Sequence, residues 1–200
     1  MISSNSLINI LYKVARRFTL KRKLKLIDKL TVSNPPKLLD FGCGTGGFLQ
    51  VSANNGWEAY GIEPNSNARM VASSNDNCVV VDHLDQLNTY NFDIITLWHV
   101  IEHIPDINST IEKLKALLKS KGRLVVAVPN NESWDALKYK EHWAAYDLPR
   151  HLYHFTQDSM RSLLKNHKLK IEAMLPMKLD SYYVSLLSEK YKRQDGKTKG

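Results

Sequence analysis

Apolar and polar residues alternate in blocks along the chain, and the period within each block predicts its structure. Short unbroken apolar runs indicate buried strands, and apolar residues at three- and four-residue steps indicate amphipathic helices. The expected strands are 37–41, 57–62, 78–82, 92–98, 122–128 and 169–175. The expected helices are 7–30, 46–55, 65–73, 107–120 and 158–166.

The alternation of these strands and helices predicts the fold class. Strands made of continuous apolar runs are buried on both faces, which is typical of a parallel sheet covered by helices on both sides. The sequence therefore predicts an α/β protein with a Rossmann-like parallel sheet. The alternation stops in residues 130–157, which are rich in aromatic residues and histidine and have no clean period.

Length and composition indicate one main domain with shorter segments at its ends. The 200 residues are 43% hydrophobic, which suits a single sizeable core. We expect an N-terminal basic amphipathic helical segment at 1–34, the main domain at 35–189 and a polar basic tail at 190–200. The chain has no run of about 20 apolar residues to span a membrane, and its start lacks the pattern of a secretory leader. Because it has only two cysteines, a reducing cytoplasm is the expected location.

The net charge of +8 is concentrated at the two ends of the chain. Residues 1–31 hold eight basic residues against one acidic residue, whereas residues 32–185 are slightly acidic. A nucleic acid is therefore not the expected partner, because such proteins usually spread basic residues over the reading face. The basic helix at 7–30 has three interpretations: a solvated face, a lid over a binding site, or a peripheral contact with anionic membrane lipid.

The turn after the first expected strand is rich in glycine. Gly42, Gly44 and Gly47 fit the dinucleotide pattern G-x-G-x-x-G, which alone is a weak signal. Asp40 lies where a dinucleotide fold usually has an apolar residue, and a carboxylate there suits a ligand with ammonium and sulfonium groups. Glu63 ends the second strand, where a carboxylate can accept hydrogen bonds from both ribose hydroxyls.

These motifs resemble the class I S-adenosylmethionine-dependent methyltransferases over about residues 36–175. The resemblance rests on Leu38–Gly46 for the first motif, Gly61–Pro64 for the second, Phe92–Ile104 for the fourth strand and its exit, and Leu124–Asn130 for the fifth strand. The segment Asp147–Leu152, with Phe155 and Thr156, is similar to a bacterial subgroup that methylates small molecules.

The resemblance implies S-adenosylmethionine as the cofactor and assigns residues to its parts. The glycine backbone and Asp40 would hold the methionine part, Glu63 the ribose and Asp82 the adenine amino group. The expected cofactor-binding residues are Asp40, Phe41, Gly42, Cys43, Gly44, Gly46, Glu63, Pro64, Asp82 and Trp98. Structural interpretations stay open for four of them: Asp40 as a loop anchor, Glu63 as a helix cap, Asp82 as a strand end and Trp98 as core.

The resemblance also implies the strand order 3-2-1-4-5-7-6, with an antiparallel seventh strand between the fifth and the sixth. Tyr183, Leu186 and Leu187 fall at helical steps, so residues 181–190 favour a helix over that strand. We therefore expect the chain to stop before a seventh strand, which would be missing at the C-terminus.

His99-Val100-Ile101-Glu102-His103 matches H-x-x-E-H, the signature of a group of zinc enzymes. That chemistry requires a helix that turns both imidazoles toward one metal, and a further ligand. Here the segment directly follows a buried strand, and Pro105 closes it two residues later. We therefore expect no metal.

Methyl transfer needs mainly the positioning of two reactants, which contributes roughly 7–11 kcal/mol without a covalent intermediate. A general base matters only where the acceptor must lose a proton. The candidate catalytic residues are His151, His99 and Arg150, with His154 as a further possible base. Arg150 suits an anionic acceptor or a contact within its own loop. Candidates for an apolar wall around the acceptor are Trp134, Trp143, Tyr146 and Tyr153.

The sequence thus favours an enzyme that moves a methyl group from S-adenosylmethionine to oxygen, nitrogen or carbon of a small-molecule acceptor. One alternative is an NAD(P)-binding Rossmann oxidoreductase, which Asp40 disfavours. The other is a module that binds the cofactor and serves as an interaction surface without turnover.

Overall fold

The structure, a computed structural model, describes residues 4–74 and 76–198, with side chains for 16–74 and 76–195. The chain forms two compact units. The first, named here the sheet unit, comprises residues 1–98 and 113–126. The second, named the C-terminal unit, comprises residues 99–112 and 127–200.

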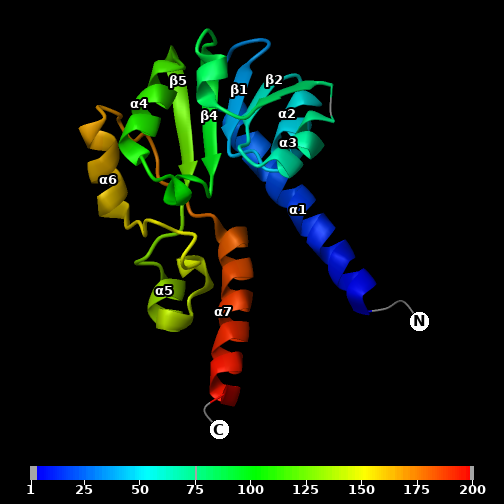
Figure 1. Ribbon diagram of the computed structural model, residues 1–200, viewed down its shortest axis with the longest axis vertical. Coiled ribbons are helices and arrows are strands. Elements are labelled where there is room, and N and C mark those ends of the chain that lie inside the picture. The colour runs from blue at the N-terminus through cyan, green and yellow to red at the C-terminus, as the bar shows by residue number, and fades with distance from the viewer. Residues whose placement is uncertain (1–3, 75, 199–200) are drawn as a thin grey trace. The chain divides into compact units, whose positions relative to one another are not determined.

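The sheet unit is built on a five-stranded sheet with the order β3-β2-β1-β4-β5 (Figure 1). Its strands are β1 (Lys37–Phe41), β2 (Glu58–Ile62), β3 (Cys78–Val81), β4 (Phe92–Trp98) and β5 (Leu118–Ala127). β1 pairs in parallel with both β2 and β4, and β2 pairs in parallel with β3. The predicted Rossmann-like α/β fold is confirmed, including the order of the first five strands.

Helices α1 (Ser4–Asp28), α2 (Gly47–Ala53) and α3 (Ser66–Ser73) also belong to the sheet unit, with the short 3-10 helix η1 (Leu84–Leu87). The C-terminal end of α1 is part of its core, because Leu24 and Ile27 are buried in one cluster with Leu38 and Phe48. The indole nitrogen of Trp57 donates a hydrogen bond of 2.8 Å to Asp28. The predicted N-terminal helix is therefore confirmed, although the side chains of residues 1–15, including Lys13, lie outside the described residues.

A buried carboxylate joins three segments of the sheet unit. Asp93, at the start of β4, accepts hydrogen bonds from the Ser33 hydroxyl at 2.5 Å, the Lys37 amide at 2.8 Å and the Lys119 ammonium at 2.7 Å. Burial raises the pKa of Asp93, but the hydrogen bonds from Lys119, Ser33 and Lys37 outweigh it and lower the pKa below its ordinary value. Asp93 is thus a structural anion rather than a site residue.

The C-terminal unit consists of one long helix and several short ones. Its elements are η2 (Ile101–His103), α5 (Trp134–Tyr139), η3 (Lys140–His142), η4 (Ala144–Tyr146), α6 (Gln157–Asn166) and α7 (Lys178–Thr198). Helix α4 (Ile107–Ala116) begins in this unit and ends in the sheet unit. Ala136, Tyr139, Trp143 and Ala145 form a small core, against which Tyr146 and Val184 pack. None of the helices within the described residues is long and apolar enough to cross a membrane.

Two predictions about the second half of the chain are wrong. Residues 169–175 form no strand, because a strand needs a paired neighbour and the sheet of the described residues ends at β5. The helix expected at 107–120 ends at Ala116, and β5 begins at Leu118 instead of Gly122. The carbonyl of Leu117 accepts the Phe92 amide at 2.8 Å, so the chain already joins the sheet there. The helix expected at 181–190 is confirmed as part of α7.

Candidate functional site

The glycine turn after β1 has the backbone geometry of a ligand cradle. Gly42, Gly44 and Gly46 all have positive φ, at 74°, 56° and 74°. A Cβ on Gly44 would meet no atom within 4 Å, so the turn is open at that point. A Cβ on Gly46 would lie 2.9 Å from the Cβ of Ala72, which shows how closely α3 packs there. The amides of Gly42 and Cys43 donate to the carbonyl of Ile62 and fix the turn to the end of β2.

Glu63 is held against this turn by two backbone amides. Its Oε2 accepts the Gly44 amide at 2.8 Å, and its Oε1 accepts the Asn65 amide at 2.9 Å. The N-cap of α3 is Asn65, whose side chain accepts the Ala68 amide, so Glu63 is not the cap of that helix. Each carboxylate oxygen can accept a second hydrogen bond, so Glu63 retains the capacity to bind two ligand hydroxyls.

Asp40 is a buried carboxyl group paired across two strands. The Thr96 hydroxyl donates a hydrogen bond of 2.6 Å to its Oδ1. Burial raises the pKa of Asp40 to about 7, although the Thr96 hydrogen bond and the positive charge of Lys23 lower it. The bond joins β1 to β4, and a cationic ligand would stabilise the ionised form of Asp40.

Trp98 ends β4 and lies beneath a cation from α1. The Lys23 ammonium lies 4.4 Å from the centroid of its ring, and the ring of Phe48 meets it edge-on at 5.6 Å. The indole nitrogen of Trp98 is buried and has no hydrogen-bond partner among the described residues. Trp98 also packs against the core cluster that contains Leu38 and Phe48, so it is both part of the core and a source of one unpaired donor.

The other expected cofactor residues lie at or just after the ends of β1, β2 and β3. Asp82 follows β3, its side chain is 37% exposed, and its Oδ2 lies 3.9 Å from an Arg69 nitrogen. Arg69 also donates to the carbonyls of Glu63 and Pro64, at 2.6 Å and 2.9 Å. Phe41 ends β1, and Cys43 in the turn is buried, which raises the pKa of its thiol to about 12 and keeps it neutral.

Three further residues around this turn could not be assigned to it from the sequence. Thr96 pairs with Asp40 from the neighbouring strand. Two cations of α1 also lie here: Lys23 over Trp98, and Arg16, whose Nη2 lies 3.5 Å from the Thr45 hydroxyl. The basic composition of residues 7–30 was visible in the sequence, but which cations face the turn depends on how α1 docks.

In the C-terminal unit, His99 is held between two carboxylates. It has a positive φ of 58°, and its Nε2 lies 3.2 Å from Oδ2 of Asp180. Its Nδ1 lies 3.6 Å from Oε1 of Glu102. Burial lowers the pKa of His99, but the hydrogen bond with Asp180 and the negative charges of Asp180 and Glu102 outweigh it and raise the pKa to about 9. His99 is therefore protonated at neutral pH and suits a fixed positive charge better than a general base.

Arg150 and His151 lie on one turn but differ in environment. The side chain of Arg150 is 75% exposed and donates two hydrogen bonds to Oδ1 of Asp147, at 3.1 Å and 2.6 Å. Arg150 thus makes the contact within its own loop that was one of its two expected roles. His151 has a mostly buried ring, and burial lowers its pKa, so the neutral imidazole is favoured.

Of the predicted wall residues, Trp143 is buried and Trp134 is 69% exposed. His154 bonds the carbonyl of Tyr146 at 3.1 Å.

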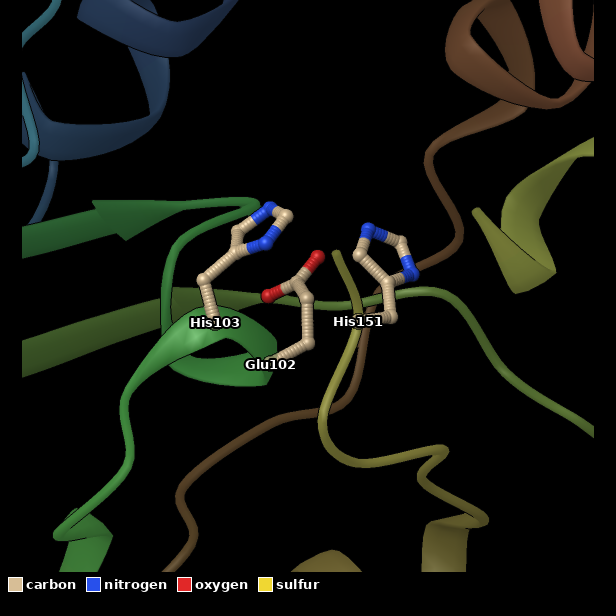
Figure 2. Close-up of side chains that lie close together, drawn as sticks. All are labelled: Glu102, His103 and His151. Atoms are coloured by element: carbon tan, nitrogen blue, oxygen red, sulfur yellow. The ribbon is translucent and has the colours of Figure 1, made fainter. Parts of the chain in front are cut away.

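The structure also brings together Glu102, His103 and His151, whose side chains face one another in Figure 2. Each offers one candidate metal-ligand atom, and these atoms lie within 4.8 Å of one another. The two imidazole rings meet edge to face, with centroids 4.6 Å apart. The H-x-x-E-H spacing pointed to His99 and His103, but the group that the fold assembles contains His151 in place of His99.

Comparison with known proteins gives a family and several relatives. A family model described as a methyltransferase domain matches residues 13–173. The ubiquinone biosynthesis O-methyltransferase of Glaesserella parasuis serovar 5 (strain SH0165) is 35% identical over 107 residues, covering 47% of this chain and 45% of that protein. The one of Rhodopseudomonas palustris (strain BisB18) is 26% identical over 155 residues, covering 68% of this chain and 58% of that protein. The chain thus spans about half the length of the curated relatives it matches.

Solved methyltransferases share the fold at low sequence identity. A SAM-dependent methyltransferase from Archaeoglobus fulgidus superposes with a TM-score of 0.62 and 16% identity, covering 94% of this chain and 92% of that one. Magnesium protoporphyrin IX methyltransferase from Synechocystis PCC 6803 with bound SAH gives a TM-score of 0.59 and 17% identity, covering 76% of this chain and 73% of that one.

Proposed function

Because the chain belongs to the methyltransferase domain family, we propose that it transfers a methyl group from S-adenosylmethionine to oxygen, nitrogen or carbon of a small-molecule acceptor. Membership of this family argues against the NAD(P) oxidoreductase considered from the sequence. The observation that carries the proposal is Glu63, held by the amides of Gly44 and Asn65 beside an open turn with three positive-φ glycines. That arrangement presents a carboxylate and exposed backbone together, as a nucleoside ligand requires.

The residues of the sheet unit fit S-adenosylmethionine. The cofactor, when bound, supplies a methyl group activated by a positively charged sulfur. Glu63 would accept the ribose hydroxyls, and the open backbone at Gly44 would contact the methionine part. Asp40 would contribute negative charge toward the cationic end of the cofactor. Trp98 offers a buried donor with no partner among the described residues, and Asp82 would face the adenine end.

On the acceptor side, we assign His99, Arg150 and His151 distinct roles. His99 is an imidazolium at neutral pH and would stabilise negative charge. Arg150 is exposed enough to leave Asp147 for an anionic acceptor group. His151 is the one of the three whose neutral imidazole can accept a proton. The relatives named as O-methyltransferases favour an oxygen acceptor, and the free cysteines Cys43 and Cys78 suit a cytoplasmic protein.

Calorimetry tests the cofactor assignment directly. We expect the chain to bind S-adenosylhomocysteine and not NAD, and Glu63→Ala to lose affinity by about 1.5–3 kcal/mol. Tyr60→Phe, on the same strand β2 but away from the turn, is the matched control and should bind normally. Equal affinity of wild type and Glu63→Ala, with both folded, would contradict the assignment. Cofactor binding without methyl transfer to any acceptor in a small-molecule panel would favour the interaction module instead.

A further inference from the structure

The carboxylate of Glu102 is a buried anion without the hydrogen bonds that such a group needs. Its side chain is 0% exposed, and neither oxygen has a hydrogen-bond partner among the described residues. The nearest described cation, Nδ1 of His99, is 3.6 Å from Oε1, and His99 also bonds Asp180 at 3.2 Å. A buried carboxylate with so little compensation is costly, so its environment favours a further positive charge.

The two imidazoles next to Glu102 have the tautomer that a metal ion requires. Nδ1 of His103 lies 2.9 Å from the backbone carbonyl of Arg150, and Nδ1 of His151 lies 2.8 Å from that of Ala145. A carbonyl oxygen only accepts, so in each ring Nδ1 carries the proton and donates it. In the neutral ring, Nε2 then has an unprotonated lone pair. Backbone carbonyls commonly fix metal-binding histidines in this way.

The backbone brings these residues together from distant parts of the sequence. Glu102 and His103 lie on η2, and the carbonyl of Glu102 accepts the amide of Leu152 at 2.8 Å. Asp147 has a positive φ of 40°, and its carbonyl accepts the amide of His151 at 3.1 Å, which turns the chain back toward η2. All three residues belong to one unit, and their side chains lie close together (Figure 2).

We propose that Glu102, His103 and His151 bind one divalent transition-metal ion, with zinc as the reference ion. Two imidazoles and one carboxylate form a ligand set that suits zinc and neighbouring metals and leaves a coordination position open. Ligand atoms around a tetrahedral zinc are about 3.3 Å apart. One candidate ligand atom from each of the three side chains lies within 4.8 Å of the other two.

The proposed metal site differs from the expectation of no metal because its ligands are not the pair of histidines in the H-x-x-E-H pattern. The H-x-x-E-H pattern requires a helix that carries both His99 and His103, and η2 is only a single short turn. The third ligand instead comes from His151, which no local spacing connects with Glu102. A metal would use the Nε2 lone pair of His151 and so replace the proton-accepting role proposed above for that residue. The proposal does not depend on methyl transfer.

Zinc titration of the full chain after treatment with a chelator tests the site. We expect one zinc ion per chain by calorimetry and a higher unfolding temperature with zinc. Glu102→Gln, His103→Ala and His151→Ala should each lower the affinity at least about tenfold, by analogy with the loss of supporting groups around metals. His154→Ala is the matched control, because His154 also bonds a backbone carbonyl but lies outside the group. Cobalt should give a spectrum without thiolate bands, which separates this site from Cys43 and Cys78.

The proposal would be overturned if the wild-type protein neither binds zinc nor gains stability from it. It would also be overturned by unchanged zinc affinity in folded Glu102→Gln and His151→Ala, or by an equal loss of affinity in His154→Ala. If a variant does not fold, the zinc-dependent stability of the wild type and the cobalt spectrum decide the matter. Cobalt bands typical of thiolate ligands would likewise contradict it.

Discussion

The hydroxyl of Thr96 on β4 donates a hydrogen bond of 2.6 Å to Asp40 on β1, and both side chains are buried. The two residues are also direct register partners in the parallel sheet. Burial raises the pKa of Asp40 from 3.8 to about 7, so the ligand-free protein holds this proton through much of the acidic range. Because the folded state binds the proton more tightly than the unfolded state, stability falls as the pH rises through this window.

The first prediction follows from that proton. A cationic cofactor favours ionised Asp40, so binding should release close to one proton per chain at pH 6 and very little at pH 8. Affinity should rise over the same interval. Calorimetry in two buffers with different ionisation enthalpies measures the release, and Asp40→Asn should abolish it. Equal proton release in wild type and Asp40→Asn would show that Asp40 does not respond to the cofactor.

The second prediction separates two glycines of the turn. Gly44→Ala introduces strain at a positive φ of 56° and should cost about 1–2 kcal/mol in the free energy of unfolding. Gly46→Ala adds a contact of 2.9 Å with the Cβ of Ala72 and should cost roughly 1–3 kcal/mol more. Urea denaturation measures both. Gly44→Ala should also weaken cofactor binding, since its methyl group fills open space above the turn. Similar stability of the two variants would show that α3 moves aside.

Local sequence patterns predicted the sheet unit well, because its strands and turns follow from residues that are close together in the sequence. The run Phe92–Trp98 has the predicted bounds, and Asp40 and Glu63 lie where strand ends placed them. The two predictions that were wrong concern segments whose structure depends on partners far away in the sequence. Residues 169–175 have the composition of a strand but no neighbour to pair with, and β5 starts early because Leu117 meets Phe92.

In the candidate site, too, some residues could be predicted from local sequence and others depend on distant contacts. Residues of the turn could be named from their motif, whereas Lys23 over Trp98 depends on how α1 docks. The meeting of Glu102 with His151 depends on a turn at Asp147 and a hydrogen bond between two distant backbone segments. No periodicity or spacing encodes such contacts.

The third prediction concerns His99, whose pKa is raised to about 9 although burial lowers it. Asp180→Asn should lower that pKa, and NMR titration of the ring measures the change. Since the folded pKa exceeds the ordinary value of 6.5, the stabilisation is complete below that pH and disappears as the pH rises through about 9. Asp195→Asn is the control, because Asp195 bonds His142 at 3.1 Å and not His99. An unchanged titration in Asp180→Asn would contradict the assigned cause.

The last prediction tests Arg150 as an acceptor-binding residue. Its ion pair with Asp147 is exposed, so Arg150→Ala should change the free energy of unfolding by less than about 1 kcal/mol. Cofactor affinity should also stay normal, because every assigned cofactor residue lies in the sheet unit. If Arg150 binds an anionic acceptor, KM for the acceptor should rise at least tenfold, and Arg150→Lys should restore only part of the loss, because lysine lacks the two-pronged contact.

Arg161→Ala provides the matched comparison for this variant. Arg161 forms a similar exposed pair with Asp158 three residues earlier, at 3.9 Å, but lies on α6 outside the turn that carries His151. Removing it changes the net charge of the protein by the same amount, so a general electrostatic effect on a charged acceptor would appear equally in both variants. A selective rise of KM in Arg150→Ala would therefore report a specific contact. Equal kinetics in the two variants would leave Arg150 with only its bond to Asp147, and the acceptor would have to be bound by other residues.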